Sequence, residues 1–266
     1  MKDIPKLGFG TFGRTGNAGI AALETAVEVG YRHFDTAQSY DTEREVGVAI
    51  KNSGLAREDV WVTTKIDMAN YGEGKLAPSL EGSIERLGLT PDLTLLHWPS
   101  PNGAVPLEVY LDQIVAAKAQ GLTREIGVSN FPIALLDAAM ARAGPGAILT
   151  NQFELNPLHN NAKLARHCQS VGVLVTCYLP IAKGRLHGEP VAEAIAEKHG
   201  VPIERIALAW ELAKGYAAIP TSSRADRIAS NFAARDVALT SADIAALDAI
   251  SQTARAIDPN WGPDWD

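Results

Sequence analysis

The chain has 266 residues, of which 46% are hydrophobic, so it can bury a substantial core in one large domain or two small ones. Its formal net charge of -7 argues against nucleic acid and against an anionic membrane surface as partners. The sequence has no apolar run of about 18 residues, so we predict no transmembrane helix. Cys168 and Cys177 are too few for a disulfide framework and badly spaced for zinc, which favours two reduced thiols in a cytoplasmic protein.

Short apolar runs alternate with amphipathic stretches along the whole sequence, which is typical of repeated βα units. The runs predict strands at 7–11, 31–36, 60–65, 93–98, 124–129, 148–153, 173–178 and 217–222. The stretches predict helices around 17–29, 42–53, 75–87, 106–120, 132–142, 161–171, 190–214, 224–233 and 241–252.

Local signals refine these helices. Thr42 and Glu45 have the spacing of a capping box, which predicts a helix that begins immediately after Tyr40. Gly200 and Pro202 predict a break within the stretch 190–214. Eight strands with helical crossovers in about 250 residues predict an α/β fold, a (β/α)8 TIM barrel. We expect a single domain over residues 1–266, with the active site at the C-terminal strand ends.

Four polar side chains lie where the first predicted strands end. Asp35, Lys65 and His97 end three successive apolar runs, and Tyr40 follows the first of them. Because parallel strands end at one rim of a sheet, we expect the four to converge there. Each residue alone has an ordinary explanation, as a helix cap, a strand-end cation, a core histidine or a rim aromatic. Four such residues together are better explained by one site.

These residue types suit proton delivery to a carbonyl group. A tyrosine has an ordinary pKa of roughly 10, and an ammonium within reach stabilises its phenolate and lowers that pKa. Lys65 would do this for Tyr40, and Asp35 would pair with Lys65. His97 could donate a hydrogen bond to the carbonyl oxygen. Tyr40 could then protonate that oxygen as a hydride reaches the carbon.

A glycine motif near the start competes with this interpretation. Gly8, Gly10 and Gly13 match G-x-G-x-x-G, and Asp35 follows at about the distance expected of a dinucleotide-binding Rossmann unit. A Rossmann helix should open within the glycines, whereas residues 14–16 keep the chain in a loop. We therefore interpret the match as coincidence, and expect the glycines to allow backbone to pass close to a ligand.

Seven motifs along the chain match those of a known family. They are GFGTF (8–12), GYRHFDTAQSYDTEREVG (30–47), TTK (63–65), DLTLLHWPSP (92–101), GLTREIGVSNF (121–131), NQFELNP (151–157) and IPTSSRADRIASNF (219–232). With these motifs the sequence resembles the aldo-keto reductases over nearly its whole length. Within that family it is most similar to the bacterial 2,5-diketo-D-gluconate reductases, especially the B type that also reduces methylglyoxal.

The resemblance implies roles for individual residues. It makes Asp35, Tyr40, Lys65 and His97 the catalytic tetrad and requires no metal. It implies that NADPH contacts Gly10, Thr11, Asp35, Ser129, Asn130, Gln152, Tyr178, Leu179, Lys183, Ser222, Ser223, Arg224, Arg227 and Asn231. The substrate pocket would include Phe12, Asp67, Trp98 and Trp261.

Two positions depart from the family pattern. Thr221 stands where the family often has a lysine, although Arg224 and Arg227 remain for a 2′-phosphate, so NADPH is favoured over NADH. Asp67 stands where a pocket tryptophan is common. It would make the pocket hydrophilic and disfavour anionic substrates, unless its side chain turns to solvent or caps a loop.

The resemblance implies a cytoplasmic, monomeric reductase of small aldehydes, dicarbonyls or keto sugars. Two alternatives keep the fold: an alcohol dehydrogenase working in the oxidative direction, and a nicotinamide-binding regulatory subunit with little turnover. The last residues, 253–266, contain Trp261 and Trp265, and we expect them to shape the substrate pocket. The alternative is a tail that packs on the outer wall of the barrel.

Overall fold

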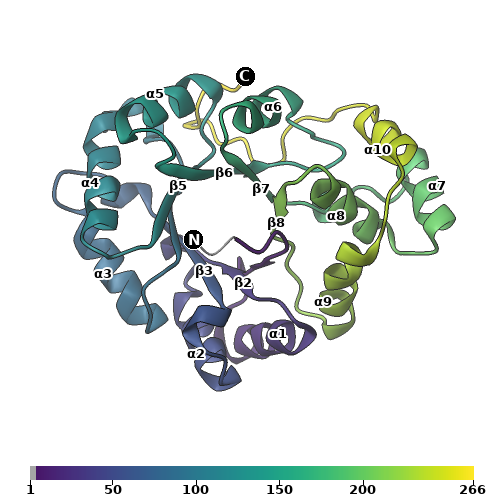
Figure 1. The fold of residues 1–266 in the computed structure, drawn as a ribbon, viewed down its shortest axis with the longest axis horizontal. Helices are drawn as coiled ribbons and strands as arrows, with labels where there is room; N and C mark the ends of the chain where they lie inside the picture. Colours follow the sequence, from purple (N-terminus) through teal and green to yellow (C-terminus); the bar gives the residue numbers. More distant parts are fainter. Residues whose placement is uncertain (1–3) are drawn as a thin grey trace.

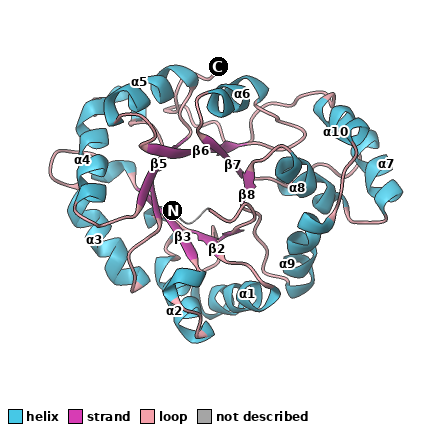
Figure 2. Ribbon diagram, viewed as in Figure 1, coloured by secondary structure: helices cyan, strands magenta, loops and turns pink. Residues whose placement is uncertain are grey.

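A computed structural model describes residues 4–266, in which eight parallel strands form one curled sheet in chain order. Figure 1 and Figure 2 show the strands as an inner ring and the helices around it. The strands are β1 (Phe9–Gly10), β2 (His33–Asp35), β3 (Trp61–Ile66), β4 (Leu93–Leu96), β5 (Glu125–Ser129), β6 (Ile148–Glu154), β7 (Leu174–Tyr178) and β8 (Ala217–Ala218). The predicted eight parallel strands are thereby confirmed.

Backbone hydrogen bonds join the two ends of the sheet. Leu7 and Ala218 form a parallel bridge. The N–H of Gly8 donates to the carbonyl of Ala218 over 2.9 Å, and the N–H of Ala218 donates to the carbonyl of Lys6 over 2.7 Å. The sheet therefore closes on itself, as a (β/α)8 barrel requires. That residues 1–266 form one domain stays a prediction, and residues 1–3 lie outside the described part.

The helices follow the predicted order with small shifts at their ends. They are α1 (Gly16–Val29), α2 (Glu43–Ser53), α3 (Leu76–Leu87), α4 (Leu107–Ala119), α5 (Ile133–Ala143), α6 (Ala162–Ser170), α7 (Pro190–His199), α8 (Ile203–Ala213), α9 (Ala225–Phe232) and α10 (Ser241–Asp248). The predicted break separates α7 from α8: Gly200 ends α7 with a φ of 63°, and Pro202 caps α8. Within residues 4–266, none of these helices has the length and apolar character to cross a membrane.

The predicted capping box at Thr42 is wrong, although α2 does begin at the next residue. The Thr42 hydroxyl instead forms hydrogen bonds of 2.8 Å with the hydroxyls of Thr11 and Thr36. Glu45 accepts a hydrogen bond from the N–H of Gly16 over 2.7 Å. Contacts distant in sequence have therefore taken both side chains away from the helix end.

Strand β8 is shorter than the predicted 217–222. Pro220 has no N–H to donate to a sheet ladder, so regular pairing ends before it. Its carbonyl still accepts a hydrogen bond of 2.9 Å from the N–H of Gly10. The main apolar core fills the space between the sheet and the helices, and its largest side chains, such as Trp210 and Phe153, are fully buried.

After α10 the chain runs back over the sheet beside β6, drawn in yellow in Figure 1. The N–H of Thr253 donates to the carbonyl of Leu158 over 2.7 Å, which fixes the start of this segment. We call residues 253–266 the C-terminal segment. It lies at the C-terminal ends of the strands, as expected of a segment that shapes a pocket there.

Candidate active site

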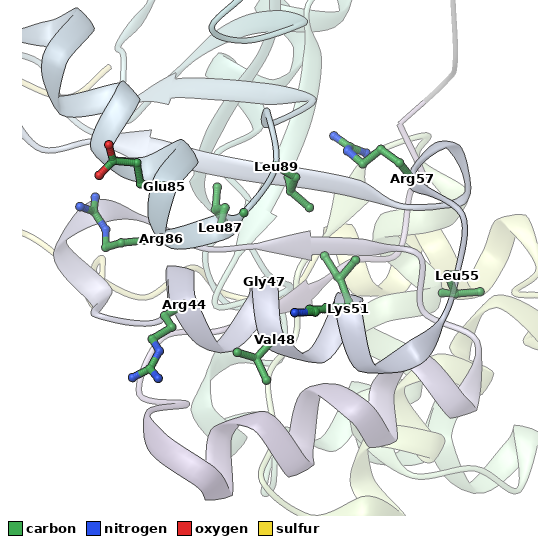
Figure 3. Close-up of a pocket in the computed structure, with 12 residues that line it drawn as sticks. Arg44, Gly47, Val48, Lys51, Leu55, Arg57, Glu85, Arg86, Leu87 and Leu89 are labelled. Atoms are coloured by element: carbon green, nitrogen blue, oxygen red, sulfur yellow. The ribbon is translucent and has the colours of Figure 1, made fainter.

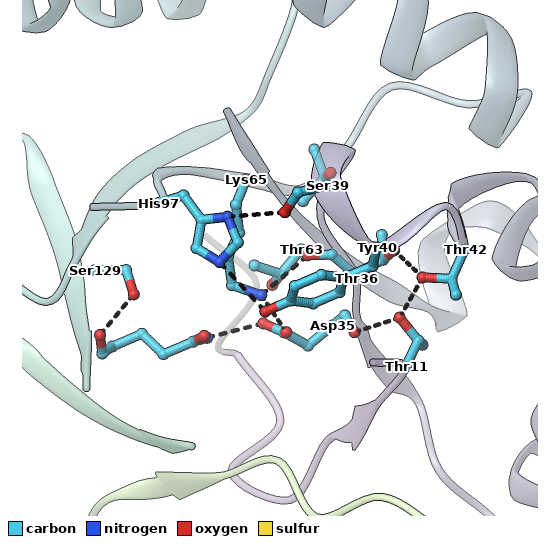
Figure 4. A network of polar contacts seen from close by, with 12 residues as sticks. Thr11, Asp35, Thr36, Ser39, Tyr40, Thr42, Thr63, Lys65, His97 and Ser129 are labelled. Atoms are coloured by element: carbon cyan, nitrogen blue, oxygen red, sulfur yellow. Dashed lines mark hydrogen bonds and ion pairs between the residues drawn. The ribbon is translucent and has the colours of Figure 1, made fainter. Parts of the chain in front are cut away.

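The four predicted polar side chains meet at one rim of the barrel, as Figure 4 shows for Asp35, Tyr40, Lys65 and His97. The ammonium of Lys65 forms an ion pair with Asp35 and donates to the carbonyl of Thr36 over 3.0 Å. It also lies 4.9 Å from the centre of the Tyr40 ring. The Tyr40 hydroxyl lies 3.3 Å from Nε2 of His97. One ion pair and one phenol–imidazole contact thus form a continuous polar cluster.

Charges in this cluster are set by burial and by the Asp35–Lys65 pair. Burial lowers the pKa of Lys65, but the Asp35 carboxylate and Tyr40 outweigh it, so that the net shift is upward and Lys65 remains an ammonium. Burial lowers the pKa of His97 to about 3, and the nearby Lys65 charge adds to this. His97 is therefore a neutral imidazole at neutral pH.

The pKa of Tyr40 is shifted upward, so the predicted lowering is wrong. Lys65 does lower the pKa of Tyr40, as expected, but burial raises it more, and the pKa is above its ordinary value. The reason is that the charge of a phenolate would be poorly solvated here, and the Asp35 carboxylate also repels it. Tyr40 is consequently a phenol that holds its proton until a reaction takes it.

Four predicted cofactor residues extend the cluster at the ends of β5, β6 and β7. Gln152 donates its amide N–H to Asp35 over 2.8 Å, and its backbone carbonyl accepts the hydroxyl of Ser129 over 2.7 Å. Asn130 adopts a left-handed φ of 62° and donates its amide to the carbonyl of His97 over 3.1 Å. The Tyr178 hydroxyl donates to Oδ1 of Asn130 over 2.8 Å. The structure therefore brings these four side chains together beside the tetrad.

Gly10 and Thr11, at the end of β1, were predicted to border the cofactor. In the structure both contact other parts of the chain. The Thr11 N–H and hydroxyl each donate to the carbonyl of Asp35 over 3.0 Å. A Cβ at Gly10 would lie 2.8 Å from the carbonyl oxygen of Ile219. We expected the glycines to admit a ligand, whereas the visible reason for Gly10 is the close approach of the chain after β8.

The remaining predicted cofactor residues lie on two segments that follow β7 and β8. In the segment 179–186, Leu179 and Lys183 have φ values of 50° and 53°, and Lys183 is exposed. Ser222, Ser223, Arg224 and Arg227 lie at the start of α9, and Asn231 is buried within it. Arg224 already forms an ion pair of 2.7 Å with Asp226, so Arg227 is the more available cation.

The structure fits a phosphate-bearing ligand at the start of α9. Thr221 Oγ1 is shielded from water and has no hydrogen-bond partner among residues 4–266. Buried hydroxyls are normally paired, so an unpaired one in the loop that leads to exposed Ser223 and Arg227 is suited to a polar ligand group. This supports the NADPH prediction, which the unusual Thr221 had put in question.

The predicted substrate residues fall into two groups. Phe12 is 68% exposed and its ring meets that of Tyr40 edge-on at 5.2 Å. Trp98 is buried beneath the C-terminal segment, with ring centres 5.3 Å from Trp261 and 6.0 Å from Trp265. These contacts bring the segment to the residue that follows His97. That it shapes the substrate pocket stays a prediction.

Asp67 caps its own loop, which was the alternative to a role in making the pocket hydrophilic. Its Oδ1 accepts a hydrogen bond of 2.9 Å from the N–H of Ala69, and it starts the short 3-10 turn Met68–Asn70. Its own N–H donates to Gln38 over 2.8 Å. The carboxylate is thus engaged with its own loop, which weakens the expectation that it repels anionic substrates.

Sequence reasoning missed several residues that support the site. Ser39 Oγ lies 3.4 Å from Nδ1 of His97, which can fix the tautomer of that ring. Thr36 and Thr42 tie β2 to the first loop. Glu154 is a buried carboxylate at the end of β6. Its position in the NQFELNP motif, two residues after Gln152, was the available signal.

A separate groove of about 520 Å³ lies between α2 and α3 on the outer wall, shown in Figure 3. Two of its arginines are engaged in ion pairs: Arg57 with Asp92 over 2.7 Å and Arg86 with Glu43 over 2.6 Å. These cations hold the outer wall together. The groove lacks the convergent polar side chains of the tetrad, so the rim of the barrel is the better candidate site.

Comparison with known proteins decides the family. A family model described as the Aldo/keto reductase family matches residues 6–252. The chain belongs to this family. A methylglyoxal reductase DkgB of Salmonella typhi is 42% identical to this aldo/keto reductase over 265 residues, 99% of each chain.

Solved structures agree with this placement. A crystal structure provisionally assigned as a 2,5-diketo-D-gluconic acid reductase B has a TM-score of 0.94 and 34% identity, and covers 99% of this chain and 94% of that one. An aldo-keto reductase of Bombyx mori, solved in complex with NADP, has a TM-score of 0.87 and 31% identity, over 96% and 92% of the two chains. The predicted resemblance to this family is confirmed.

Proposed function

We propose that this aldo/keto reductase uses NADPH to reduce small aldehydes, dicarbonyls or keto sugars, of the methylglyoxal or 2,5-diketo-D-gluconate type, to alcohols. The observation that carries the proposal is the protonated Tyr40 phenol, 3.3 Å from neutral His97 and beside the Lys65 ammonium that Asp35 holds. Similarity to a methylglyoxal reductase supports the substrate class.

In this proposal, the chain's residues orient the carbonyl and deliver a proton. Nε2 of neutral His97 donates a hydrogen bond to the carbonyl oxygen, with Ser39 at Nδ1 fixing the tautomer. The Tyr40 hydroxyl donates its proton to the same oxygen, and Lys65 stabilises the phenolate that remains. Asp35 keeps Lys65 in place. Solvent then returns a proton to Tyr40.

The cofactor residues would hold NADPH along β5–β8. Ser129, Asn130 and Gln152 offer amide and hydroxyl groups to the carboxamide, and Tyr178 offers its ring to the nicotinamide. Nearby backbone at Gly10, Thr11 and Leu179 would border the cofactor, and Lys183 would meet its phosphates. Ser222, Ser223, Arg224 and Arg227 would meet the 2′-phosphate, and Asn231 the adenine. Bound NADPH would supply the hydride that reaches the carbonyl carbon.

The raised pKa of Tyr40 favours reduction over the oxidative alternative. It keeps Tyr40 in the protonated form that carbonyl reduction requires, whereas alcohol oxidation needs the phenolate as a base. The same cluster argues against a regulatory subunit with little turnover, because such a subunit needs no proton donor. We keep the prediction of a cytoplasmic, monomeric, single-domain enzyme as part of this proposal.

Tyr40→Phe tests the proposal by removing one hydroxyl. General acid catalysis is typically worth about 10²–10⁴-fold, so kcat with methylglyoxal should fall by roughly that factor. The NADPH dissociation constant, measured by cofactor fluorescence, should change little. Parallel assays with NADH test the cofactor preference. Near-normal kcat in the variant would refute the role of Tyr40, and a wild-type enzyme inactive on every carbonyl offered would refute the function.

A further inference from the structure

Glu154 is a buried carboxylate that the mechanism above does not use. It is fully buried at the end of β6, where it is in register with Tyr178 of β7. Both of its oxygens accept the N–H of Ala256 over 2.9 Å, and Oε2 also accepts the N–H of Ile257 over 2.9 Å. Backbone of the C-terminal segment thus supplies the hydrogen bonds that this buried side chain cannot receive from water.

Further contacts around Glu154 fix the position of the C-terminal segment at this point. The guanidinium of Arg185 lies 3.9 Å from Oε1 of Glu154, at the outer limit of an ion pair. Asn161 donates its amide to the backbone carbonyl of Glu154 over 2.7 Å and accepts Arg255 over 3.1 Å. Arg255 in turn lies 3.4 Å above the ring of Trp265. One short stretch of the segment is therefore attached to β6 and to an aromatic ring of the proposed pocket.

The attachment is what places the aromatic rings. Residues 253–266 form no helix or strand, so no ladder of their own fixes their path. Downstream of Ile257, Trp261 and Trp265 reach Trp98, the residue after His97. Movement of the chain at residues 256–257 would displace both rings relative to the tetrad.

We propose that Glu154 is a positioning residue that holds the C-terminal segment over the barrel rim and thereby sets the aromatic wall of the substrate pocket. The inference rests on the proposed function for its kinetic consequences, but the attachment itself can be measured without turnover. A carboxylate is suited to the task because both oxygens only accept hydrogen bonds. In a glutamine, one of the two positions becomes an NH2 group that faces N–H donors.

Glu154→Gln is the main test. Hydrogen–deuterium exchange at residues 256 and 257 should become at least about ten-fold faster, because an NH2 group replaces one of the two acceptors and repels the N–H donors that face it. With 4-nitrobenzaldehyde, KM should rise by about ten-fold or more while kcat changes by less than about three-fold, since ground-state and transition-state binding are lost together. For methylglyoxal, which is too small to need the wall, KM should change by less than about three-fold.

Glu211→Gln is the matched control. Glu211 is also fully buried but lies in α8, and its carboxylate makes no hydrogen bond within residues 4–266. This variant should leave exchange at residues 256 and 257 and both KM values unchanged. The same changes in both variants would show a general effect of altering a buried carboxylate, and would overturn the proposal.

Ala256→Pro approaches the attachment from the other side and leaves the buried strand intact. Proline removes the N–H that both oxygens of Glu154 accept. Ala254→Pro is its control, because the N–H of Ala254 makes none of these bonds. Ala256→Pro should reproduce the effect of Glu154→Gln on KM, and the double variant should be no worse than either. Additive effects, or unchanged exchange in Glu154→Gln, would overturn the proposal.

The two proposals fail in different ways. If the wild-type enzyme reduces no carbonyl, the function is wrong, while exchange at residues 256 and 257 still tests the attachment. If the wild type reduces both aldehydes and the KM for 4-nitrobenzaldehyde is unchanged in Glu154→Gln, the positioning role is wrong and the function stands.

Discussion

Asp35 and Glu211 are both buried carboxylates, but the molecule treats them differently. Asp35, at the end of β2, pairs with Lys65 and accepts an amide from Gln152 over 2.8 Å. Neither oxygen of Glu211, in α8, has a hydrogen-bond partner among the described residues. Burial raises the pKa of Glu211 well above its ordinary value, so this side chain is protonated at neutral pH.

The difference shows what distinguishes a site from a buried acid. Burying a charge costs several kcal/mol unless partners compensate for the lost water. At Asp35 the compensation comes from Lys65 of β3 and Gln152 of β6 together. At Glu211 the proton itself removes the charge. The nearby Cys177 thiol offers no compensating charge, because burial raises its own pKa well above its usual range.

The largest effect should come from removing the partner of Asp35. Lys65→Met leaves an uncompensated buried carboxylate, which typically costs about 3–5 kcal/mol of unfolding free energy. Urea denaturation at pH 7 measures this loss. Adding Asp35→Asn should recover much of the stability but none of the turnover. A loss below about 1 kcal/mol in the single variant would mean that the ion pair is not what makes burial of Asp35 tolerable.

Substitution of Glu211 should raise the stability of the protein, in contrast to substitution of Lys65, and the gain should depend on pH. The folded protein holds a proton on Glu211 that the unfolded chain releases above a pKa of about 4.3. Stability therefore falls as the pH rises between the unfolded and folded pKa values, by about 1.4 kcal/mol per pH unit. Glu211→Gln removes this penalty.

The melting temperature of Glu211→Gln should thus exceed that of the wild type at pH 8, and the gap should close toward pH 4. Scanning calorimetry over that range measures it, with the exposed Glu197→Gln in α7 as the control. A gap that does not depend on pH would show that Glu211 is ionised in the folded protein.

The smallest effect is expected at Asp67, a partly exposed carboxylate between these extremes. Asparagine caps a turn about as well as aspartate, so Asp67→Asn should change the unfolding free energy by only a few tenths of a kcal/mol. Because the side chain caps its own loop, kcat/KM for 2,5-diketo-D-gluconate relative to methylglyoxal should change by less than about two-fold. A ten-fold gain for the carboxylate substrate would place Asp67 against the substrate after all.

The sequence predicted the strands and the meeting of Asp35, Tyr40, Lys65 and His97 because both depend on local pattern. Apolar runs locate the strands, and the parallel arrangement brings their ends together. The end of β8 was misjudged because Pro220 continues the apolar run but has no N–H to donate to the ladder.

The errors have a common physical cause, which is contact between distant residues. Thr42 has the spacing of a cap, yet Thr11, 31 positions away, takes its hydroxyl. The direction of the Tyr40 pKa depends on how much water the closed barrel excludes, and no local pattern gives that quantity. Glu154 was visible in a motif, but its partners at residues 256 and 257 come from the other end of the chain.

Because Glu154 holds the C-terminal segment by its backbone, the residues that anchor the segment differ from the residues that would select the substrate. Its carboxylate binds backbone N–H groups, which every residue except proline provides, so the side chains at positions 256 and 257 can vary without loss of the anchor. The rings at Trp261 and Trp265 can then be exchanged while the segment stays in place. A barrel built this way can acquire new substrates by changing a few residues near one end of its chain, with the proton-delivery residues left untouched.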